Sequence, residues 1–287
     1  FRGLDLQTQH VRANILDRFC EAYGDWPYAG LDRPAVVKLR DKRAETPGAA
    51  NELVKVLRQV FKVAVEYGYH DSNPAAEVAF LSSKNSEGFH AWTVKEVEQF
   101  EKTHPVGTKV HLVLALAMYG GCARRSDIVR LGKQHMTKDG SRLQYTQFKG
   151  RNSENPSHID IPVIPELRRI IGASPCGDLT FLVTEFGRPF SAKGFGNRFK
   201  KYCVDASLSH CSVHGLRKAA AARLAELGCT DLEIMAIGGW KTLKEVQRYT
   251  KGARKRVLSN NAMDKVQADI EGTEMSNLAS GGKKVRR

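Results

Sequence analysis

The sequence predicts a mainly α-helical protein with a small antiparallel β-sheet, divided into a helical first domain and a mixed α/β second domain. Three observations predict this. Residues 48–67 carry apolar side chains at helical spacing. Residues 82–91, SSKNSEGFHA, form a polar stretch typical of an interdomain linker. Residues 141–164 hold two short segments in which apolar and polar side chains alternate, as they do in half-buried strands.

The first domain, expected over residues 1–84, has the pattern of a small all-helical bundle. Residues 6–23 and 33–44 are predicted helices, and the helix at 48–67 follows Pro47, which favours a helix start. The apolar face of that last helix comprises Leu53, Val56, Leu57, Val60, Phe61 and Ala64.

The second domain, expected over residues 85–273, opens with a helix start signal. Thr93 is followed three residues later by Glu96, the spacing of a capping box. A long apolar helix is predicted over residues 108–119, and the glycine turn after it leads into a further helix at ARRSDIVRL.

Strands and then helices complete the second domain. The strand candidates are residues 141–149 and 158–164, joined by the polar loop GRNSENPS. Helices return from about residue 190. They include residues 212–228, SVHGLRKAAAARLAELG, and a final helix at 257–273. Residues 274–287 are expected to form a basic flexible tail.

The chain is strongly basic, with 45 lysine and arginine residues against 31 aspartate and glutamate residues and a net charge of +14. Such an excess favours a polyanionic partner, and nucleic acid is the first expectation. An anionic membrane surface would require a basic amphipathic helix or a lipid anchor, and neither is evident. No apolar run approaches the about 18 residues of a membrane span.

The six cysteines include no CxxC pair, which predicts reduced thiols in a cytoplasmic protein. His210, Cys211 and His214 lie close together near Cys203, so a zinc site is one interpretation of this segment. Because the spacing matches no standard zinc finger, we expect no metal there.

Seven polar or aromatic residues are grouped at predicted helix starts, turns and strand tips. In chain order they are Arg124, Asp127, Lys149, His214, Arg217, Trp240 and Tyr249. His214 and Arg217 stand three residues apart and therefore share one helix face. Arg124 and Asp127 are likewise one helical turn apart.

Two arginines, a lysine, a histidine and a tyrosine suit displacement at a phosphodiester. The transition state concentrates negative charge on the non-bridging oxygens, to which guanidinium groups offer paired donors. A tyrosine hydroxyl can attack phosphorus and conserve the bond energy as a phosphotyrosine. A lysine can protonate the leaving sugar oxygen.

Each of these residues also has a purely structural interpretation. Arg124 and Asp127 fit a surface ion pair, and His214 fits a histidine satisfied at a helix start. Trp240 and Tyr249 fit core residues. The side chains taken singly therefore suggest this chemistry without deciding it.

In their order and spacing, these motifs make the chain resemble the tyrosine recombinase, or phage integrase, family. GGCARRSDIVRL is similar to the family's first box, with Arg124 rather than Arg125 as the box arginine. Lys149 in TQFKGRN is similar to the hairpin lysine, and HGLRKAAAARLAELG to the His-x-x-Arg box of His214 and Arg217.

IGGWKTLKEVQRYTK resembles the family's last box, with Trp240 and the nucleophile Tyr249. Histidine is the commoner residue at the Trp240 position. An indole donates one hydrogen bond and packs but transfers no proton. Trp240 is therefore expected to orient the phosphate or to pack.

The resemblance implies a site-specific DNA recombinase, an integrase of a bacterial mobile element or prophage. Its catalytic residues would be Arg124, Lys149, His214, Arg217, Trp240 and Tyr249. Tyr249 would attack the scissile phosphate to form a 3'-phosphotyrosine, the two arginines would stabilise the phosphorane, and Lys149 would protonate the 5'-oxygen. His214 would assist proton movement at Tyr249, and Asp127 would steady Arg124 or His214.

The resemblance also implies the architecture and the partners. Residues 1–84 would be a SAM-like core-binding domain and residues 85–273 the catalytic domain, together forming a C-shaped clamp around double-stranded DNA. Members act as homotetramers on two duplexes through a Holliday junction, and the helix at 257–273 would pack on a neighbouring subunit. DNA-bending accessory proteins are further candidate partners. No cofactor, metal or membrane is expected, and the site of action would be the bacterial cytoplasm at the nucleoid.

Contacts to DNA are expected from the polar faces of the helices. The candidate residues are Lys38, Arg40, Lys42, Arg43, Asn51, Lys55, Arg58 and Lys193. Members often carry an additional arm-binding domain, and a chain that begins at Phe1 is expected to be a fragment without it.

Two other functions remain open at this point. A type IB topoisomerase resembles the recombinases in its active site and relaxes DNA as a monomer, but the helical first domain favours a recombinase. A DNA-binding regulator could keep the fold without the chemistry, but the complete set of boxes favours an enzyme.

Overall fold

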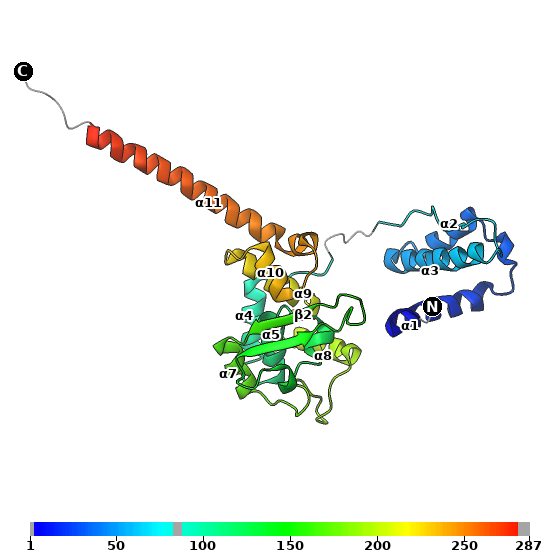
Figure 1. Cartoon of the computed structure of the whole chain (residues 1–287), viewed down its shortest axis with the longest axis horizontal. Coiled ribbons are helices and arrows are strands. Elements are labelled where there is room, and N and C mark those ends of the chain that lie inside the picture. Colours follow the sequence, from blue (N-terminus) through cyan, green and yellow to red (C-terminus); the bar gives the residue numbers. More distant parts are fainter. Residues whose placement is uncertain (1–2, 83–87, 281–287) are drawn as a thin grey trace, which may run out of the picture. The chain divides into compact units, whose positions relative to one another are not determined.

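The computed structural model describes residues 3–82 and 88–280 and divides the chain into two compact units, Phe1–Gly88 and Phe89–Arg287 (Figure 1). The predicted domain boundary after residue 84, and much of the predicted linker, lie outside the described residues. Within the described ranges, no helix combines the length and the apolar character needed to cross a membrane.

The first unit is helical, as predicted. It contains α1 (Leu6–Tyr23), a 3-10 turn (Tyr28–Gly30), α2 (Arg33–Asp41) and α3 (Pro47–Glu66). α2 ends three residues before the predicted bound because Lys42 donates to the carbonyls of both Lys38 and Arg40, which closes the last turn. The buried core of this unit consists of Val36, Leu39, Leu53, Val54, Leu57, Ala75 and Val78.

The second unit is built around a buried helix. Its helices are α4 (Val94–Thr103), α5 (Lys109–Tyr119), α6 (Arg125–Ile128), the 3-10 turn Lys133–His135, α7 (Pro165–Ala173), α8 (Ala192–Asp205), α9 (Val213–Glu226), α10 (Asp231–Gly238) and α11 (Leu243–Ser280). The capping box of Thr93 and Glu96 is confirmed at the start of α4. Seven consecutive residues of α5, from His111 to Ala117, are buried, and α5 packs against α7 and α9.

The predicted antiparallel pair is confirmed as β1 (Arg142–Thr146) and β2 (His158–Pro162). Leu143 pairs with Ile161 and Tyr145 with Ile159, and all four side chains are buried. Both strands are shorter than predicted. β1 stops before Lys149 because the chain turns at residues 148–150, where the Phe148 N–H bonds to a side chain instead of to β2.

Two further differences concern helices. α7 was not predicted; it begins at Pro165, a favourable first position. The separate final helix predicted at 257–273 is wrong, because α11 runs without a break from Leu243 to Ser280. Residues 274–280 of the predicted flexible tail are therefore helical, and residues 281–287 lie outside the described part of the chain.

Candidate active site

The first turn of α9 is held by a helix cap and by contacts to residues 90–92. The Ser212 side chain caps the helix by accepting from the Gly215 N–H at 3.2 Å, and the Ser212 carbonyl accepts from the Trp92 indole at 2.9 Å. A Cβ on Gly215 would lie 2.2 Å from the His90 carbonyl oxygen, so only glycine fits this close approach. The start of α9, which carries His214 and Arg217, is thereby fixed to residues 90–92.

Arg217 is almost completely buried, with 2% of its surface exposed. Its guanidinium donates to the carbonyls of Cys122 and, at 3.0 Å, Gly238, and it lies 4.0 Å from the centroid of the Trp240 ring. Burial and, secondarily, the charge of Arg124 lower the pKa of Arg217 to about 10, so the group still carries its charge at neutral pH.

Arg124 stands at the N-terminal cap of α6, directly after a turn in which Cys122 has a φ of 47°. Its guanidinium donates to the side-chain carbonyl of Gln147. The Gln147 amide donates at 2.8 Å to the Gly238 carbonyl, which also accepts from Arg217. The buried Gln147 therefore connects the two arginine sites.

Asp127, in α6, is buried, with 2% of its surface exposed. One carboxylate oxygen accepts from the Phe148 N–H at 2.7 Å, and the other has no hydrogen-bond partner among the described residues. Burial raises the pKa of Asp127, while its bond to Phe148 and the charge of Arg124 oppose that shift. The hydrogen bond of Asp127 thus reaches the turn that carries Lys149.

The Lys149 turn is held by its neighbour Phe148. The guanidinium carbons of Arg130 and Arg151 lie 3.4 Å and 3.7 Å from the centroid of the Phe148 ring. Together with the bond from Asp127, these contacts fix the backbone next to the exposed Lys149 side chain.

His214, at the start of α9, lies next to aromatic rings from other segments of the chain. The His214 ring lies 4.9 Å from the Phe89 ring and 6.4 Å from the Tyr249 ring, and Tyr249 lies 5.7 Å from the Trp240 ring. Desolvation and then the charges of Arg217, Lys218, Arg124 and Lys149 lower the pKa of His214. The imidazole is therefore neutral at pH 7.

The predicted site residues come from separate segments and converge on one region. Arg124, Lys149, His214 and Arg217 line one cleft of about 410 Å³. Tyr249, on α11, stands beside His214 through the ring contact above. Trp240 is buried under Arg217 and contacts Tyr249, so it packs in this site.

The electrostatics of this cleft favour an anion. The buried Arg217 guanidinium donates to two carbonyl oxygens and contacts an aromatic face, and the charge of Arg124 lowers the pKa of Arg217. An anion placed between the two guanidinium groups would relieve that repulsion and occupy the donors that still face the cleft. A phosphate group has the charge and the acceptors for this position.

Comparison with known proteins agrees with this geometry. A family model described as the phage integrase family matches residues 91–256, more than half of the chain. The chain belongs to the phage integrase family. A curated relative, the virulence plasmid integrase pGP8-D of Chlamydia muridarum (strain MoPn / Nigg), is 29% identical over 145 residues, which are 50% of this chain and 43% of that protein. The chain thus spans less than half the length of this relative.

Solved phage and transposon integrases have the same fold. A lambda integrase (75–356) dimer bound to a COC' core site matches with a TM-score of 0.73 and 18% identity, over 87% of this chain and 90% of that one. A lambda integrase tetramer bound to a Holliday junction matches with a TM-score of 0.73 and 16% identity, over 86% of this chain and 72% of that one. The Tn1549 transposon integrase in complex with a circular intermediate DNA matches with a TM-score of 0.70 and 16% identity, over 89% of this chain and 95% of that one.

The candidate DNA-binding residues of this integrase chain differ in what their side chains contact. Asn51 exchanges two hydrogen bonds with the Leu81 backbone, and Arg58 donates to the carbonyls of Ala75 and Val78. These two side chains hold the segment after α3. Exposed cationic side chains in the candidate set include Lys38, Lys42, Lys55 and Lys193.

Sequence reasoning missed Gln147, although it contacts Arg124 directly. The available signal was its place in the strand pattern, since Gln147 continues the buried series of Leu143 and Tyr145. A polar residue at a core position of a strand requires buried partners, and here those partners belong to the site.

Proposed function

We propose that the chain is a site-specific DNA recombinase that cleaves and rejoins strands through a phosphotyrosine at Tyr249. The Tyr249 oxygen forms a bond to the scissile phosphorus while the bond from phosphorus to the 5'-oxygen breaks, which leaves a 3'-phosphotyrosine and a free 5'-hydroxyl. His214, neutral at pH 7 and in ring contact with Tyr249, takes the phenolic proton. Lys149 protonates the leaving 5'-oxygen.

The observation that carries this proposal is that two guanidinium groups line one cleft together with His214, whose ring contacts the Tyr249 ring. Arg124 and Arg217 stabilise the extra negative charge of the five-coordinate phosphorus, and neither loses its proton during the reaction. Because the phosphotyrosine conserves the energy of the broken bond, the freed hydroxyl of a second strand reverses the step and rejoins the DNA. Strand exchange between two duplexes then passes through a Holliday junction.

The test uses a pool of nicked duplexes with a randomised segment around the nick, from which the short product strand diffuses away after cleavage. Wild-type protein should give a denaturant-stable adduct enriched in one sequence, and Tyr249→Phe should give none. Tyr202→Phe, on α8, is the matched control and should retain the adduct. Binding without an adduct would indicate a DNA-binding regulator, and relaxation of any supercoiled plasmid without sequence preference would indicate a topoisomerase. Either result would contradict the proposal.

We further propose that the chain acts as a homotetramer on two duplexes and that α11 contributes to the assembly. Leu258, Met263, Val266 and Ile270 on α11 are each about half exposed or more. The last three are spaced by three and four residues and therefore form one apolar stripe. In Figure 1, α11 extends away from the helices that its first turns contact, which leaves this stripe uncovered by its own unit.

A charge pair on the stripe tests this assembly. Val266→Glu with Ile270→Glu should abolish the synaptic complex of two duplexes in sedimentation, while the adduct on a single nicked duplex persists. Asn261→Glu with Ala268→Glu adds the same charge on the opposite face of α11 and should leave synapsis intact. Equal synapsis by both double variants would exclude this surface from the assembly.

A further inference from the structure

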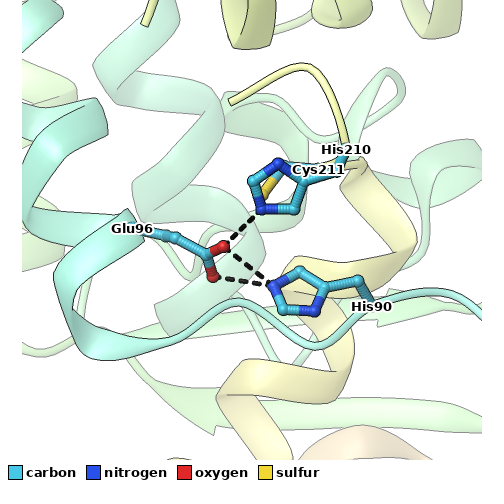
Figure 2. Close-up of side chains that lie close together, drawn as sticks. All are labelled: His90, Glu96, His210 and Cys211. Carbon is cyan, nitrogen blue, oxygen red and sulfur yellow. Dashed lines mark hydrogen bonds and ion pairs between the residues drawn. The ribbon is translucent and has the colours of Figure 1, made fainter. Parts of the chain in front are cut away.

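Four side chains with metal-binding atoms meet next to the cleft that Arg124, Lys149, His214 and Arg217 line (Figure 2), and of the four only Cys211 also lines that cleft. His90 precedes α4, Glu96 lies in its first turn, and His210 and Cys211 belong to the loop between α8 and α9. Their ligand atoms all lie within 4.8 Å of one another. The cluster thus joins two segments that are 114 residues apart in the sequence.

Two histidines converge on one carboxylate. The Nε2 atom of His210 lies 2.5 Å from Glu96 Oε1, and the Nε2 atom of His90 lies 2.9 Å from Oε1 and 2.8 Å from Oε2. The Cys211 Sγ atom lies within 4.8 Å of the Glu96 carboxylate. Figure 2 shows both imidazole rings directed at this carboxylate from different sides.

Hydrogen bonds from Thr93 orient the Glu96 carboxylate. Glu96 Oε2 accepts from the Thr93 N–H at 2.6 Å and from the Thr93 hydroxyl at 3.0 Å, as part of the capping box of α4. Oε1 faces both histidines, and His90 also contacts Oε2. An outer hydrogen bond that fixes one oxygen while the other faces a group of donors is typical of a metal-ligating carboxylate.

We propose that His90, Glu96, His210 and Cys211 form a structural zinc site. Two imidazole nitrogens, one carboxylate oxygen and one thiolate are ligands that Zn²⁺ takes in tetrahedral geometry, whereas Ca²⁺ and Mg²⁺ prefer oxygen ligands. Zinc bonds of about 2.0–2.3 Å place tetrahedral ligand atoms roughly 3.3–3.8 Å apart. The contacts to Glu96 therefore need to open, and ligand pairs near the 4.8 Å limit of the cluster need to close, by about 1 Å.

Binding requires defined protonation states. The Cys211 thiol releases its proton to solvent and binds as thiolate, and each histidine binds through a neutral Nε2 with its proton on Nδ1. Four protein ligands complete the tetrahedron, so the ion is structural and takes no part in DNA chemistry. His90 and His210 have 40% and 55% of their side chains exposed, which gives the ion a path from solvent.

The position of the cluster gives the zinc a consequence for the fold. Cys211 directly precedes Ser212, the cap of α9, and the His90 carbonyl approaches Gly215 closely. The ion therefore ties the start of α4 to the start of α9. It strengthens the contacts that already hold the first turn of α9 against residues 90–92.

Zinc titration of the full chain tests the site, independently of any recombinase activity. After chelator treatment and buffer exchange, competition with a chromophoric chelator should show one Zn²⁺ per chain. Loss of an outer hydrogen-bond partner already costs roughly 10–100-fold in metal affinity, so loss of a direct ligand should cost more than about 100-fold. His90→Ala and His210→Ala should each show this loss, and because both side chains are about half exposed, both variants should keep the fold.

Cobalt substitution identifies the thiol. Co²⁺ in the wild-type chain should give the visible bands of a tetrahedral site with a thiolate charge-transfer band, and Cys211→Ser should lose that band. His158→Ala, on an exposed strand position, and Cys176→Ser are the matched controls and should bind as the wild type does. Zinc affinity unchanged in both histidine variants, or no stoichiometric zinc in the wild type, would overturn the proposal and leave Glu96 as a hydrogen-bonded hub. If Cys211→Ser fails to fold, the two histidine variants decide.

Discussion

The Arg217 guanidinium lies 4.0 Å from the centroid of the Trp240 ring, and both groups are buried. The guanidinium packs on the face of the indole, and its hydrogen bonds to the carbonyls of Cys122 and Gly238 fix the orientation of the guanidinium. A flat, polarisable face beneath a buried cation contributes attraction without neutralising the charge. The guanidinium therefore keeps its full charge for an anion in the cleft.

Trp240→Phe and Trp240→Ala should have different effects. Phenylalanine keeps a ring under Arg217 and should retain DNA cleavage within about tenfold, since the cation–π contribution is only about 0.5–2 kcal/mol. Alanine leaves a cavity and should lower the free energy of unfolding by about 3–5 kcal/mol. Chemical denaturation and adduct formation measure the two effects. Equal losses in both variants would show that Trp240 does more than pack.

Gly238 has no room for a side chain. A Cβ there would lie 1.9 Å from the Trp240 ring, so Gly238→Ala must displace the indole or α10. Overpacking of this kind costs about 1–3 kcal/mol of unfolding free energy. Gly252→Ala in α11 is the control, because a Cβ there meets nothing within 4 Å, and it should stabilise the chain by about 0.5–1 kcal/mol. Denaturation of both variants should therefore give changes of opposite sign.

Gln147→Leu should uncouple the two arginine sites. The substitution removes the acceptor of Arg124 and leaves the buried Gly238 carbonyl with one donor fewer, which costs about 1–3 kcal/mol. The rate of adduct formation should fall by more than the loss of folded protein accounts for, because Arg124 also loses its orientation. Gln144→Leu, exposed on β1, is the control. If Gln147→Leu forms the adduct at the wild-type rate under conditions in which it is fully folded, this role for Gln147 is contradicted.

Much of the fold could be predicted from local patterns, because caps and periodicity act within a few residues. α1 has its predicted bounds, the Thr93 capping box is present, and the alternation of Leu143 and Tyr145 corresponds to burial. The length of α11 could not be predicted in this way. Its second half has little apolar contact to mark it, and residues 257–271 are mostly exposed.

The site was predictable only where residues act at fixed spacing. His214 and Arg217 share a helix turn, so their proximity follows from the sequence. Gln147 meets Gly238 across 91 residues, and His210 meets Glu96 across 114. Such contacts depend on tertiary packing, which no short motif encodes. The sequence grouped His214 with His210 and Cys211, but the structure directs it to Phe89 and Tyr249 instead.

His214 should make stability fall in mildly acidic solution. Its pKa in the folded chain is lowered from the ordinary 6.5, so the unfolded chain binds the proton first as the pH falls. The stability that the neutral imidazole provides is therefore fully present above about pH 6.5 and is lost as the pH falls through the folded pKa. His214→Gln should show a shallower loss below pH 6.5 in denaturation, and His158→Gln should follow the wild type. A pKa above 6.5 in an NMR titration of His214 would refute the expected direction.

Two substitutions should distinguish the role of Asp127 as a hydrogen-bond acceptor from the effect of its negative charge. Asp127→Asn keeps an oxygen for the Phe148 N–H, whereas Asp127→Ala leaves that donor unpaired and should be less stable than Asp127→Asn by about 1–3 kcal/mol. Because burial raises the pKa of Asp127 above its usual 3.8, the stability contribution of this carboxyl is present below pH 3.8 and is lost as the pH rises through the folded pKa. Asp127→Asn cannot ionise and should gain stability relative to the wild type over that rise, as measured by denaturation at a series of pH values. If asparagine and alanine destabilise the chain equally, the bond to Phe148 does not hold the Lys149 turn.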